Sequence, residues 1–464
     1  MTRMFRGAAS ALALVSLVLT ATALPAKEKK AEEAAPAPIN ENPYPSTYHA
    51  YPGVPTVIRG ATIFDGEGAR IDNGVVFLSD GKVTAIGGPD TPIPADVAVI
   101  DGTGKYVTPG VIDIHSHLGV YPSPGVRAHS DGNEATAPVT ADVWAEHSVW
   151  PQDPGFSRAL VNGGVTTLQV LPGSANLFGG RSVVLKNVYA RTMQGMKFPG
   201  APYGLKMACG ENPKRVYGSK GGPATRMGNM AVDRQSWIRA SEYLKKRKSG
   251  KDYSRDLELD TLADVLEGKI LVQNHCYRAD EMANVIDMSK EFGYKVSAFH
   301  HAVESYKIAD LLRENGICSA MWADWWGFKM ESYDAIEENI PLVDAAGACA
   351  IVHSDDENGI QRLYQEAAKA LGNGRRMGMN ISDEHAWTWL GINPAKALGI
   401  DKWVGSLKPG KMADVVLWNG NPLSVYTRPE KVWIDGAVMY DASNPNMRPV
   451  SDFELGQPGQ GDVK

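Results

Sequence analysis

The sequence predicts an α/β fold in which a (β/α)8, TIM-like barrel is inserted into a small β-sandwich domain formed by both ends of the chain. Three observations support this fold class. Two β-rich segments bracket the chain, eight apolar strand-like segments between them mostly alternate with helical patterns, and histidine and aspartate gather where several of those segments end. In barrel enzymes, the carboxyl ends of the strands carry the active site.

The two bracketing segments, residues 55–106 and 403–445, alternate apolar and polar side chains as half-buried strands do. Asp-Gly pairs, which favour tight turns between strands, occur at Asp65-Gly66, Asp80-Gly81 and Asp435-Gly436. Neither segment is long enough to close a hydrophobic core alone. We therefore expect the two segments to pair into one β-sandwich.

Residues 107–402 are predicted to form the barrel, because apolar strands that alternate with helices favour a parallel sheet covered by helices. The expected strands are GVIDIHSH, GVTTLQVLP, RSVVLKN, YGLKMACG, KILVQNH, YKVSAFHH, GICSAMWAD and GACAIVHSD. The third strand has the weakest support, since too few residues separate it from the second for a helix to fit between them.

Composition argues against two kinds of partner. The chain has 464 residues, of which 43% are hydrophobic, so it can bury a sizeable core. Its net charge is −6, and no stripe of clustered lysine and arginine is present. This balance argues against nucleic acid or an anionic membrane surface as a partner.

The N-terminal residues are expected to direct export. Residues 1–23 combine two arginines, an apolar run and the small-residue sequence Ala-Thr-Ala, as a cleaved signal peptide does. A transmembrane anchor is the alternative, although the run is short for a span of about 20 residues. Residues 24–54 then read as a charged, Pro/Ala-rich linker, and residues 446–464 as a tail. We expect a secreted or periplasmic protein with no stable membrane anchor after cleavage.

The four cysteines are dispersed, and each lies in or beside an apolar strand-like run. They are Cys209, Cys276, Cys318 and Cys349. This spacing is not that of a dense disulfide scaffold. We expect buried free thiols, although export would permit disulfides.

Two histidines, His115 and His117, end the first barrel strand with one residue between them. Side chains alternate along a strand, so both imidazoles point the same way. The pair alone is weak support for a metal site, because two unrelated histidines would give the same pattern.

Other strand ends strengthen the metal interpretation. His275 ends the fifth strand, the adjacent His300 and His301 end the sixth, and His353 and Asp355 share one face at the end of the eighth. The chain has only ten histidines, so this concentration at one end of the barrel favours metal ligands. Neutral imidazole and carboxylate suit Zn²⁺ or a similar divalent ion.

Two long motifs give the chain a family resemblance. GKYVTPGVIDIHSHLG resembles the first-strand signature of the amidohydrolase superfamily, and GINPAKALGIDKWVGSLKPGKMADVVLW resembles its exit into the small β domain. The similarity is greatest to exported imidazolonepropionase-like members and covers nearly the whole mature chain. It implies the same architecture, a barrel with a β-sandwich made from both chain ends.

The resemblance also implies a ligand set for two metal ions. His115 and His117 would bind the more buried metal, and His275 would bind the second with a histidine of the sixth strand. We expect His301 in this place, because HHAVESYKIAD resembles the family's strand-six ending, and keep His300 as the alternative. Two Zn²⁺ ions are expected, while Mn²⁺ and Fe²⁺ would accept the same ligands.

By the same resemblance, Asp355 would contact the first metal and act as general base and then general acid. His353 shares its face and would support the ligands or contact substrate. Asp356 faces the other way.

Binuclear members also need an anionic bridge. Lys206 lies on the small, inward face of the fourth strand, where a charged lysine is costly to bury, and N-carboxylation would make it an anion, as in related family members. Glu211 is the alternative bridge. In a third interpretation, Lys206 and Glu211 form a buried ion pair over a single metal.

Residues after strands four and seven are candidates for contacts with substrate. Arg215, Tyr217 or Arg226 could hold a substrate carboxylate, and the aromatic segment MWADWWGF could wall an apolar pocket. A solvated loop and ordinary barrel packing explain these two segments equally well.

The expected function is metal-dependent hydrolysis of a C–N bond, in an amide, cyclic amide or small peptide, by a metal-activated hydroxide. A mononuclear, deaminase-type member and a non-catalytic exported binding protein are the alternatives. The expected partner is a small-molecule or dipeptide-like substrate, and family habit suggests a homo-oligomer.

Overall fold

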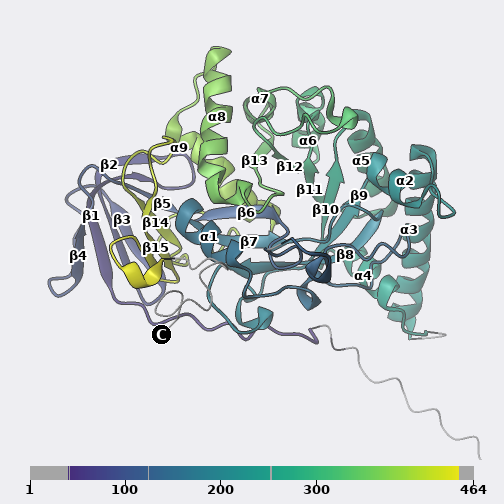
Figure 1. Cartoon of the computed structure of the whole chain (residues 1–464), viewed down its shortest axis with the longest axis horizontal. Helices are drawn as coiled ribbons and strands as arrows, with labels where there is room; N and C mark the ends of the chain where they lie inside the picture. Colours follow the sequence, from purple (N-terminus) through teal and green to yellow (C-terminus); the bar gives the residue numbers. More distant parts are fainter. Residues whose placement is uncertain (1–39, 41, 124, 251–252, 449–464) are drawn as a thin grey trace, which may run out of the picture. The chain divides into compact units, whose positions relative to one another are not determined.

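The computed structural model describes residues 40, 42–123, 125–250 and 253–448 (Figure 1). The predicted signal peptide lies outside the described residues, as do most of the predicted linker and most of the tail. The elements named below all belong to the unit that begins at Tyr44.

Strands from both ends of the chain form one eight-stranded sheet, with the order β16-β15-β14-β5-β1-β2-β3 and β4 paired to β1. The strands are β1 (Thr56–Phe64), β2 (Arg70–Ser79), β3 (Lys82–Gly87), β4 (Ala98–Asp101), β5 (Tyr106–Pro109), β14 (Val415–Trp418), β15 (Pro429–Ile434) and β16 (Ala437–Asp441). The antiparallel pairing of β5 with β14 joins the N-terminal part to the C-terminal part, which lie side by side in Figure 1. The expected pairing of the two ends is thus present, while the two-layer sandwich stays a prediction.

Two of the Asp-Gly pairs form the tight turns of this sheet. Asp80 and Gly81, with φ of 53° and 74°, connect β2 to β3, and Asp435 and Gly436, with φ of 47° and 75°, connect β15 to β16. Positive φ at both central positions is typical of the turn whose twist matches that of the flanking strands, and Asp-Gly tolerates it best.

The second sheet contains all eight of the expected barrel strands, hydrogen-bonded in chain order. They are β6 (Val111–Ser116), β7 (Val165–Val170), β8 (Phe178–Lys186), β9 (Gly204–Ala208), β10 (Leu271–Cys276), β11 (Val296–His301), β12 (Cys318–Met321) and β13 (Cys349–Val352). The expectation of an entirely parallel barrel is wrong at β8, which is antiparallel to both neighbours. A parallel pair needs a crossover of about a dozen residues or more, and the short connection 171–177 cannot supply it.

The barrel sheet is nearly closed, and the seam between β13 and β6 is joined by contacts just beyond β13. The Asp355 backbone N–H donates to the His115 carbonyl at 2.9 Å. The Ser354 hydroxyl contacts the same carbonyl at 3.1 Å and donates to the buried Asp113 carboxyl. Asp355, just after β13, therefore lies beside β6, the strand that carries His115.

Helices cover the outside of the barrel strands (Figure 1). They are α1 (Pro154–Gly163), α2 (Glu211–Tyr217), α3 (Arg226–Ser249), α4 (Leu257–Leu266), α5 (Ala279–Phe292), α6 (Ala309–Glu314), α7 (Asn339–Ala345), α8 (Leu363–Arg376), α9 (Asp383–Ala386) and α10 (Ile392–Ala397). α5 shows why they pack there: Met282, Val285 and Ile286 lie at helical spacing on one face and are buried, and Gly293 ends the helix with φ of 77°. Among residues 40–448 as described, no helix combines the length and apolarity needed to cross a membrane.

The expectation of free thiols is wrong, because the four cysteines form two disulfides. Cys209 pairs with Cys276, with Cα atoms 5.3 Å apart, and Cys318 pairs with Cys349, with Cα atoms 4.5 Å apart. Each pair joins neighbouring barrel strands, and Cys318 lies directly opposite Cys349 in the β12–β13 register. The sequence does not reveal this proximity, because cysteines 67 or 31 residues apart meet only through the sheet order.

Replacing Cys318 and Cys349 by alanine is expected to lower the free energy of unfolding by about 2–4 kcal/mol, since the disulfide restricts the unfolded chain. Urea unfolding of the oxidised double variant and the oxidised wild type measures the difference. The two proteins should converge under reducing conditions. A difference below about 0.5 kcal/mol would show that this bond does not stabilise the barrel.

Candidate metal centre

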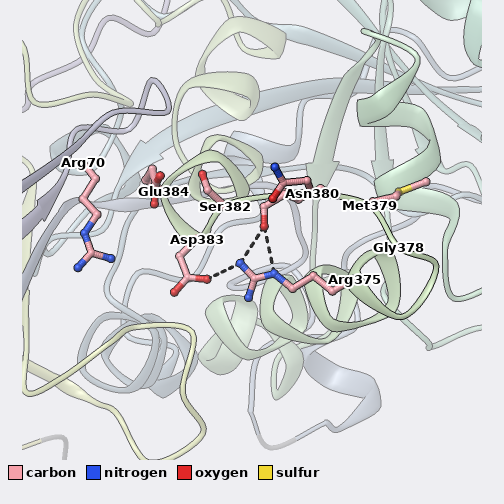
Figure 2. A pocket seen from close by; sticks show the side chains of 9 residues that line it. Arg70, Arg375, Gly378, Met379, Asn380, Ser382, Asp383 and Glu384 are labelled. Atoms are coloured by element: carbon pink, nitrogen blue, oxygen red, sulfur yellow. Dashed lines mark hydrogen bonds and ion pairs between the residues drawn. The ribbon is translucent and has the colours of Figure 1, made fainter.

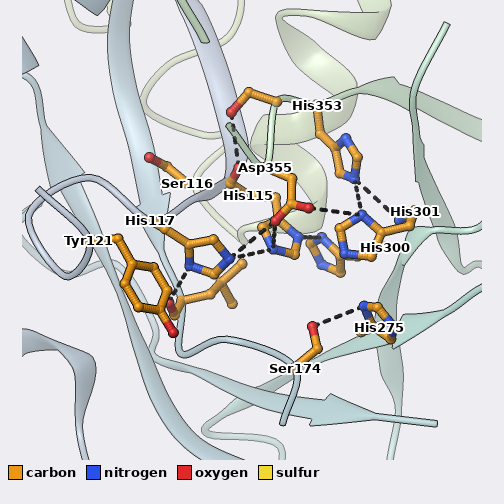
Figure 3. A network of polar contacts seen from close by, with 12 residues as sticks. His115, Ser116, His117, Tyr121, Ser174, His275, His300, His301, His353 and Asp355 are labelled. Carbon is orange, nitrogen blue, oxygen red and sulfur yellow. Dashed lines mark hydrogen bonds and ion pairs between the residues drawn. The ribbon is translucent and has the colours of Figure 1, made fainter. Parts of the chain in front are cut away.

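Three side chains from the two strands at the barrel seam converge on one point (Figure 3). His115 lies near the end of β6 and His117 just after it, and their Nε2 atoms lie 3.3 Å apart. Asp355 Oδ1 lies 3.2 Å from each of these Nε2 atoms. His115 is fully buried, while Asp355 retains some exposure.

The tautomer of His117 follows from its contact with a carbonyl. Its Nδ1 lies 2.9 Å from the Leu171 carbonyl oxygen, which can only accept a hydrogen bond. His117 therefore carries a hydrogen on Nδ1, and in the neutral ring Nε2 presents a lone pair to Asp355.

A chain of hydrogen bonds sets the tautomer of His115 in the same way. The Gln273 amide nitrogen donates to the Ala397 carbonyl, so its oxygen faces His300 Nε2 at 2.8 Å and accepts from it. Burial lowers the pKa values of His115 and His300 well below the usual range, so both rings are neutral at neutral pH. His300 Nδ1 then accepts from His115 Nδ1 at 2.9 Å, and His115 Nε2 is left as a lone pair.

The donor set fits a divalent metal ion. With neutral rings, two imidazole lone pairs and a carboxylate oxygen face one another with no hydrogen between them, an arrangement that a cation stabilises. His115, His117 and Asp355 form a group whose ligand atoms are close enough to hold one ion. Nitrogen from imidazole and oxygen from carboxylate are ligands that Zn²⁺ accepts.

A second group of imidazoles lies beside the first. His301 ends β11 with φ of 68°, and its ring lies 4.6 Å from that of His275 at the end of β10 and 4.7 Å from that of His115. His353 Nε2 lies 3.1 Å from His301 Nδ1. His115, His301 and His353 form another group that could hold an ion. His353 Nδ1 is buried and has no hydrogen-bond partner among the described residues.

Asp355 links the two groups. Its Oδ1 faces His115 and His117, while Oδ2 lies 3.8 Å from His301 Nδ1. Burial raises the pKa of Asp355, whereas positive charge on the adjacent His301 and His117 lowers it to well below its usual range. The carboxylate is therefore ionised at neutral pH.

The two predicted bridging residues lie in different places. Lys206 is fully buried on β9, and its Nζ lies 3.3 Å from His115 Nε2. Burial lowers the pKa of Lys206 to about 7. Glu211 begins α2 and turns its carboxylate toward Lys329, at 3.9 Å. The structure thus brings Lys206, and not Glu211, into contact with the imidazoles.

The residues predicted to contact substrate are also separated. Arg215 is exposed on α2, with one guanidinium nitrogen 3.5 Å from Asn212 Oδ1. Tyr217 is buried, and Arg226 forms ion pairs with Glu281 and Glu331. Arg226 is therefore already neutralised, whereas Arg215 remains available.

Several residues at the site were not found from the sequence. His275 is contacted by Ser174, whose hydroxyl lies 2.9 Å from Nδ1, and by Asn212, whose amide nitrogen lies 3.5 Å from Nε2. Ser174 lies on the loop after β7 and Asn212 in the first turn of α2 after β9, so neither belongs to a strand whose alternation would mark its direction. Gln273 could have been found, since it precedes His275 by two residues on one strand and so shares its face.

A surface pocket of about 640 Å³ lies apart from these residues (Figure 2). Its lining includes Arg375, which donates to the Ile381 carbonyl and pairs with Asp383 at 2.9 Å. None of its lining residues belongs to the histidine cluster. We therefore assign the chemistry to the cluster, whose side chains can bind an ion and transfer protons.

A nearly closed barrel with histidines and an aspartate at its strand ends is typical of barrel enzymes that have a site suited to a metal ion. The Amidohydrolase family profile matches residues 106–446. The chain is also 31% identical over 448 residues to amidohydrolase tasK of Hapsidospora irregularis, a match that covers 86% of this chain and 45% of tasK. The chain belongs to the Amidohydrolase family.

Two other relatives match over most of their length. A crystal structure of an amidohydrolase from Thermotoga maritima MSB8 is 35% identical, with a TM-score of 0.76, and the alignment covers 83% of this chain and 100% of that one. Imidazolonepropionase of Shewanella putrefaciens is 23% identical over 402 residues, which are 75% of this chain and 87% of that enzyme. The predicted superfamily is confirmed, and the TIM-like barrel fits these relatives.

The chain spans less than half the length of tasK. Two relatives that each match less than a quarter of this chain are named as deaminases. The family implies a hydrolase that acts on C–N bonds.

Proposed function

We propose that the protein is an exported, metal-dependent hydrolase that cleaves the C–N bond of an amide, a cyclic amide or a small peptide. The observation that carries the proposal is the convergence of His115 Nε2, His117 Nε2 and Asp355 Oδ1 within 3.3 Å of one another. The tautomers of the two histidines leave both Nε2 atoms with a lone pair beside the carboxylate oxygen, as metal ligation requires.

We assign two divalent ions to the site, with zinc expected and manganese or iron accepted by the same donors. The ligands would be His115, His117 and Asp355 for one ion, and His275 and His301 for the other. A metal bound there would polarise the scissile carbonyl and lower the pKa of a water molecule. His300 supports this assignment, because its contact with His115 Nδ1 holds His115 in the tautomer that ligates through Nε2.

Asp355 is assigned the proton transfers. Its carboxylate is ionised and part-exposed, so it can accept a proton from the attacking water. It then donates that proton to the leaving nitrogen, which would otherwise depart as an unstable amide anion. Its contacts with histidines of both groups support this assignment.

Lys206 is assigned the bridge. A lysine with a pKa of about 7 is substantially neutral near neutral pH, and the neutral amine is the form that reacts with CO₂. The resulting carbamate would place an anion beside His115, where the unmodified ammonium would repel a metal ion.

Export is part of the same proposal. Two disulfides within the barrel support it, because such bonds persist in oxidising compartments and are rare in the cytosol. We therefore place the protein in the periplasm or outside the cell, where dipeptides and acylated amino acids are available substrates.

Metal content per chain, measured on protein purified without chelators, tests the proposal together with a hydrolysis screen of dipeptides and N-acyl amino acids. We expect about two ions per chain and hydrolysis that chelation abolishes and zinc restores. Lys206→Met should lose one ion or both. One ion in wild type and in Lys206→Met would support a mononuclear, deaminase-type enzyme, and a metal-free active protein would refute the proposal.

A further inference from the structure

Lys329 lies beside the histidine cluster and is held by neutral oxygen atoms. Its Nζ donates to Asn212 Oδ1 at 2.9 Å and to Tyr277 Oη at 3.2 Å. The nearest carboxylate contact, with Glu211, is 3.9 Å long and therefore beyond hydrogen-bond distance. The lysine is mostly buried, with a side chain 18% exposed, so its charge lacks both full hydration and a close counter-ion.

Arg215 approaches the same acceptor from another element. It extends from α2 to Asn212 Oδ1 at 3.5 Å, while Lys329 comes from the loop between β12 and α7. Burial lowers the pKa of Lys329; the charges of Glu211 and Glu331 oppose this effect, and the charge of Arg215 adds to it. Two cations that share one neutral oxygen repel each other, and a carboxylate bound between them would remove this repulsion.

The position of this pair relative to the cluster suits an amide substrate. The Asn212 amide nitrogen lies 3.5 Å from His275 Nε2, so a single amide side chain separates Lys329 from a proposed metal ligand. In a dipeptide or an N-acyl amino acid, the terminal carboxylate is one carbon atom removed from the scissile nitrogen. A carboxylate at Lys329 would therefore leave the scissile bond near the cluster.

The loop that carries Lys329 also presents an aromatic surface. Trp322 is buried with its ring 4.5 Å from that of His301, and Trp325 and Phe328 pack on it at 5.3 and 5.8 Å. Trp325 and Phe328 are nevertheless 45% and 53% exposed. Exposed aromatic rings next to a buried site are suited to cover an apolar side chain of a ligand.

We propose that Lys329 and Arg215 bind a substrate carboxylate while Trp325 and Phe328 cover an apolar side chain. The substrate class is then amides whose amine half is an apolar amino acid with a free carboxylate. This inference rests on the proposed hydrolysis of C–N bonds, but it makes a separate statement about binding.

Calorimetric titration of the Asp355→Asn variant, which should not consume its ligand, tests the inference. The probes are N-acetyl-L-phenylalanine and its carboxamide, which differ only in the charged group. We expect the acid to bind about tenfold more tightly than the carboxamide. Adding Lys329→Met should remove most of this preference, and adding Arg215→Gln should reduce it.

Two further variants serve as controls. Lys214→Met removes the same charge from α2 one residue from Arg215 and should leave the preference unchanged. Glu211→Gln removes the competing carboxylate and should strengthen binding of the acid. Equal affinities for acid and carboxamide, or an unchanged preference in Lys329→Met and Arg215→Gln, would overturn the inference. If wild type hydrolysed both probes and did not prefer the acid, the inference about carboxylate binding would be wrong and the proposed hydrolysis would stand. If the protein preferred the acid but hydrolysed no amide, the carboxylate site would stand and the proposed hydrolysis would be wrong.

Discussion

Asp355→Asn is expected to lower kcat for amide hydrolysis by about a thousandfold, within the range found for removal of a general acid or base. Asparagine has nearly the same shape, but it cannot accept a proton from water or return one to the leaving nitrogen. The Asp355 backbone N–H would keep its bond to the His115 carbonyl, so the seam of the barrel should survive. The measurement is kcat on the best substrate of the hydrolysis screen, at matched metal content.

Asp356→Asn is the matched control, since it makes the same change one residue later. The Asp356 carboxylate accepts from the backbone N–H groups of Asn358 and Gly359, so it stabilises the loop and does not face the histidines. We expect this variant to keep most of the wild-type kcat. If Asp355→Asn kept more than about a tenth of the activity with its metal intact, another group would have to transfer the proton.

Lys186→Met is expected to lower the free energy of unfolding by about 3–5 kcal/mol, the largest stability effect predicted for this chain. Lys186 is fully buried on β8, with Nζ 2.8 Å from Asp435 Oδ1 and 3.2 Å from Asp414 Oδ1. It therefore joins the barrel to the small sheet. Methionine would fill a similar volume but leave two carboxylates buried without a cation.

The loss should depend on pH in a defined direction. Burial raises the pKa of Asp414 to about 6 even with Lys186 present. A carboxyl group whose pKa is higher in the folded than in the unfolded state stabilises most when protonated, and this contribution is lost as pH rises through the folded-state pKa. The stability deficit of Lys186→Met should therefore shrink as the pH of urea unfolding is lowered from 8 toward 5.

A triple variant separates charge from packing. Lys186→Met with Asp414→Asn and Asp435→Asn removes all three charges and should recover much of the lost stability. Lys431→Met, which breaks a more exposed pair with Asp441, should cost less than about 1 kcal/mol. A similarly small cost for Lys186→Met would contradict the importance of the buried cluster.

Most of the fold could be predicted from the sequence because hydrophobic patterning marks strands directly. Each of the eight barrel strands lies where the apolar segments placed it. Patterning does not encode the direction of a strand relative to its neighbours, so it could not predict that β8 is antiparallel. The only sign of this in the sequence is the short connection between β7 and β8. The disulfides depend on which strands are adjacent, and this is a property of the assembled sheet.

Part of the candidate site could also be predicted from the sequence, because side chains alternate along a strand. The prediction was ambiguous where the backbone leaves the β conformation. Alternation correctly places His115 and His117 on one side. It cannot choose between His300 and His301, because His301 has left the β region, with φ of 68°, and adjacent side chains then no longer point in strictly opposite directions. His300 faces His115 and Gln273, while His301 faces His275 and Asp355.

The seam of the barrel has a consequence for the order of events during synthesis. Ser354 and Asp113, which join across it, are 241 residues apart in the chain. His115 and His117 leave the ribosome early, but they cannot meet Asp355 until the whole ring of strands has been made. Tight metal binding would then require the completed chain. A nascent or truncated chain would bind an ion only weakly, because it has only part of the ligand set.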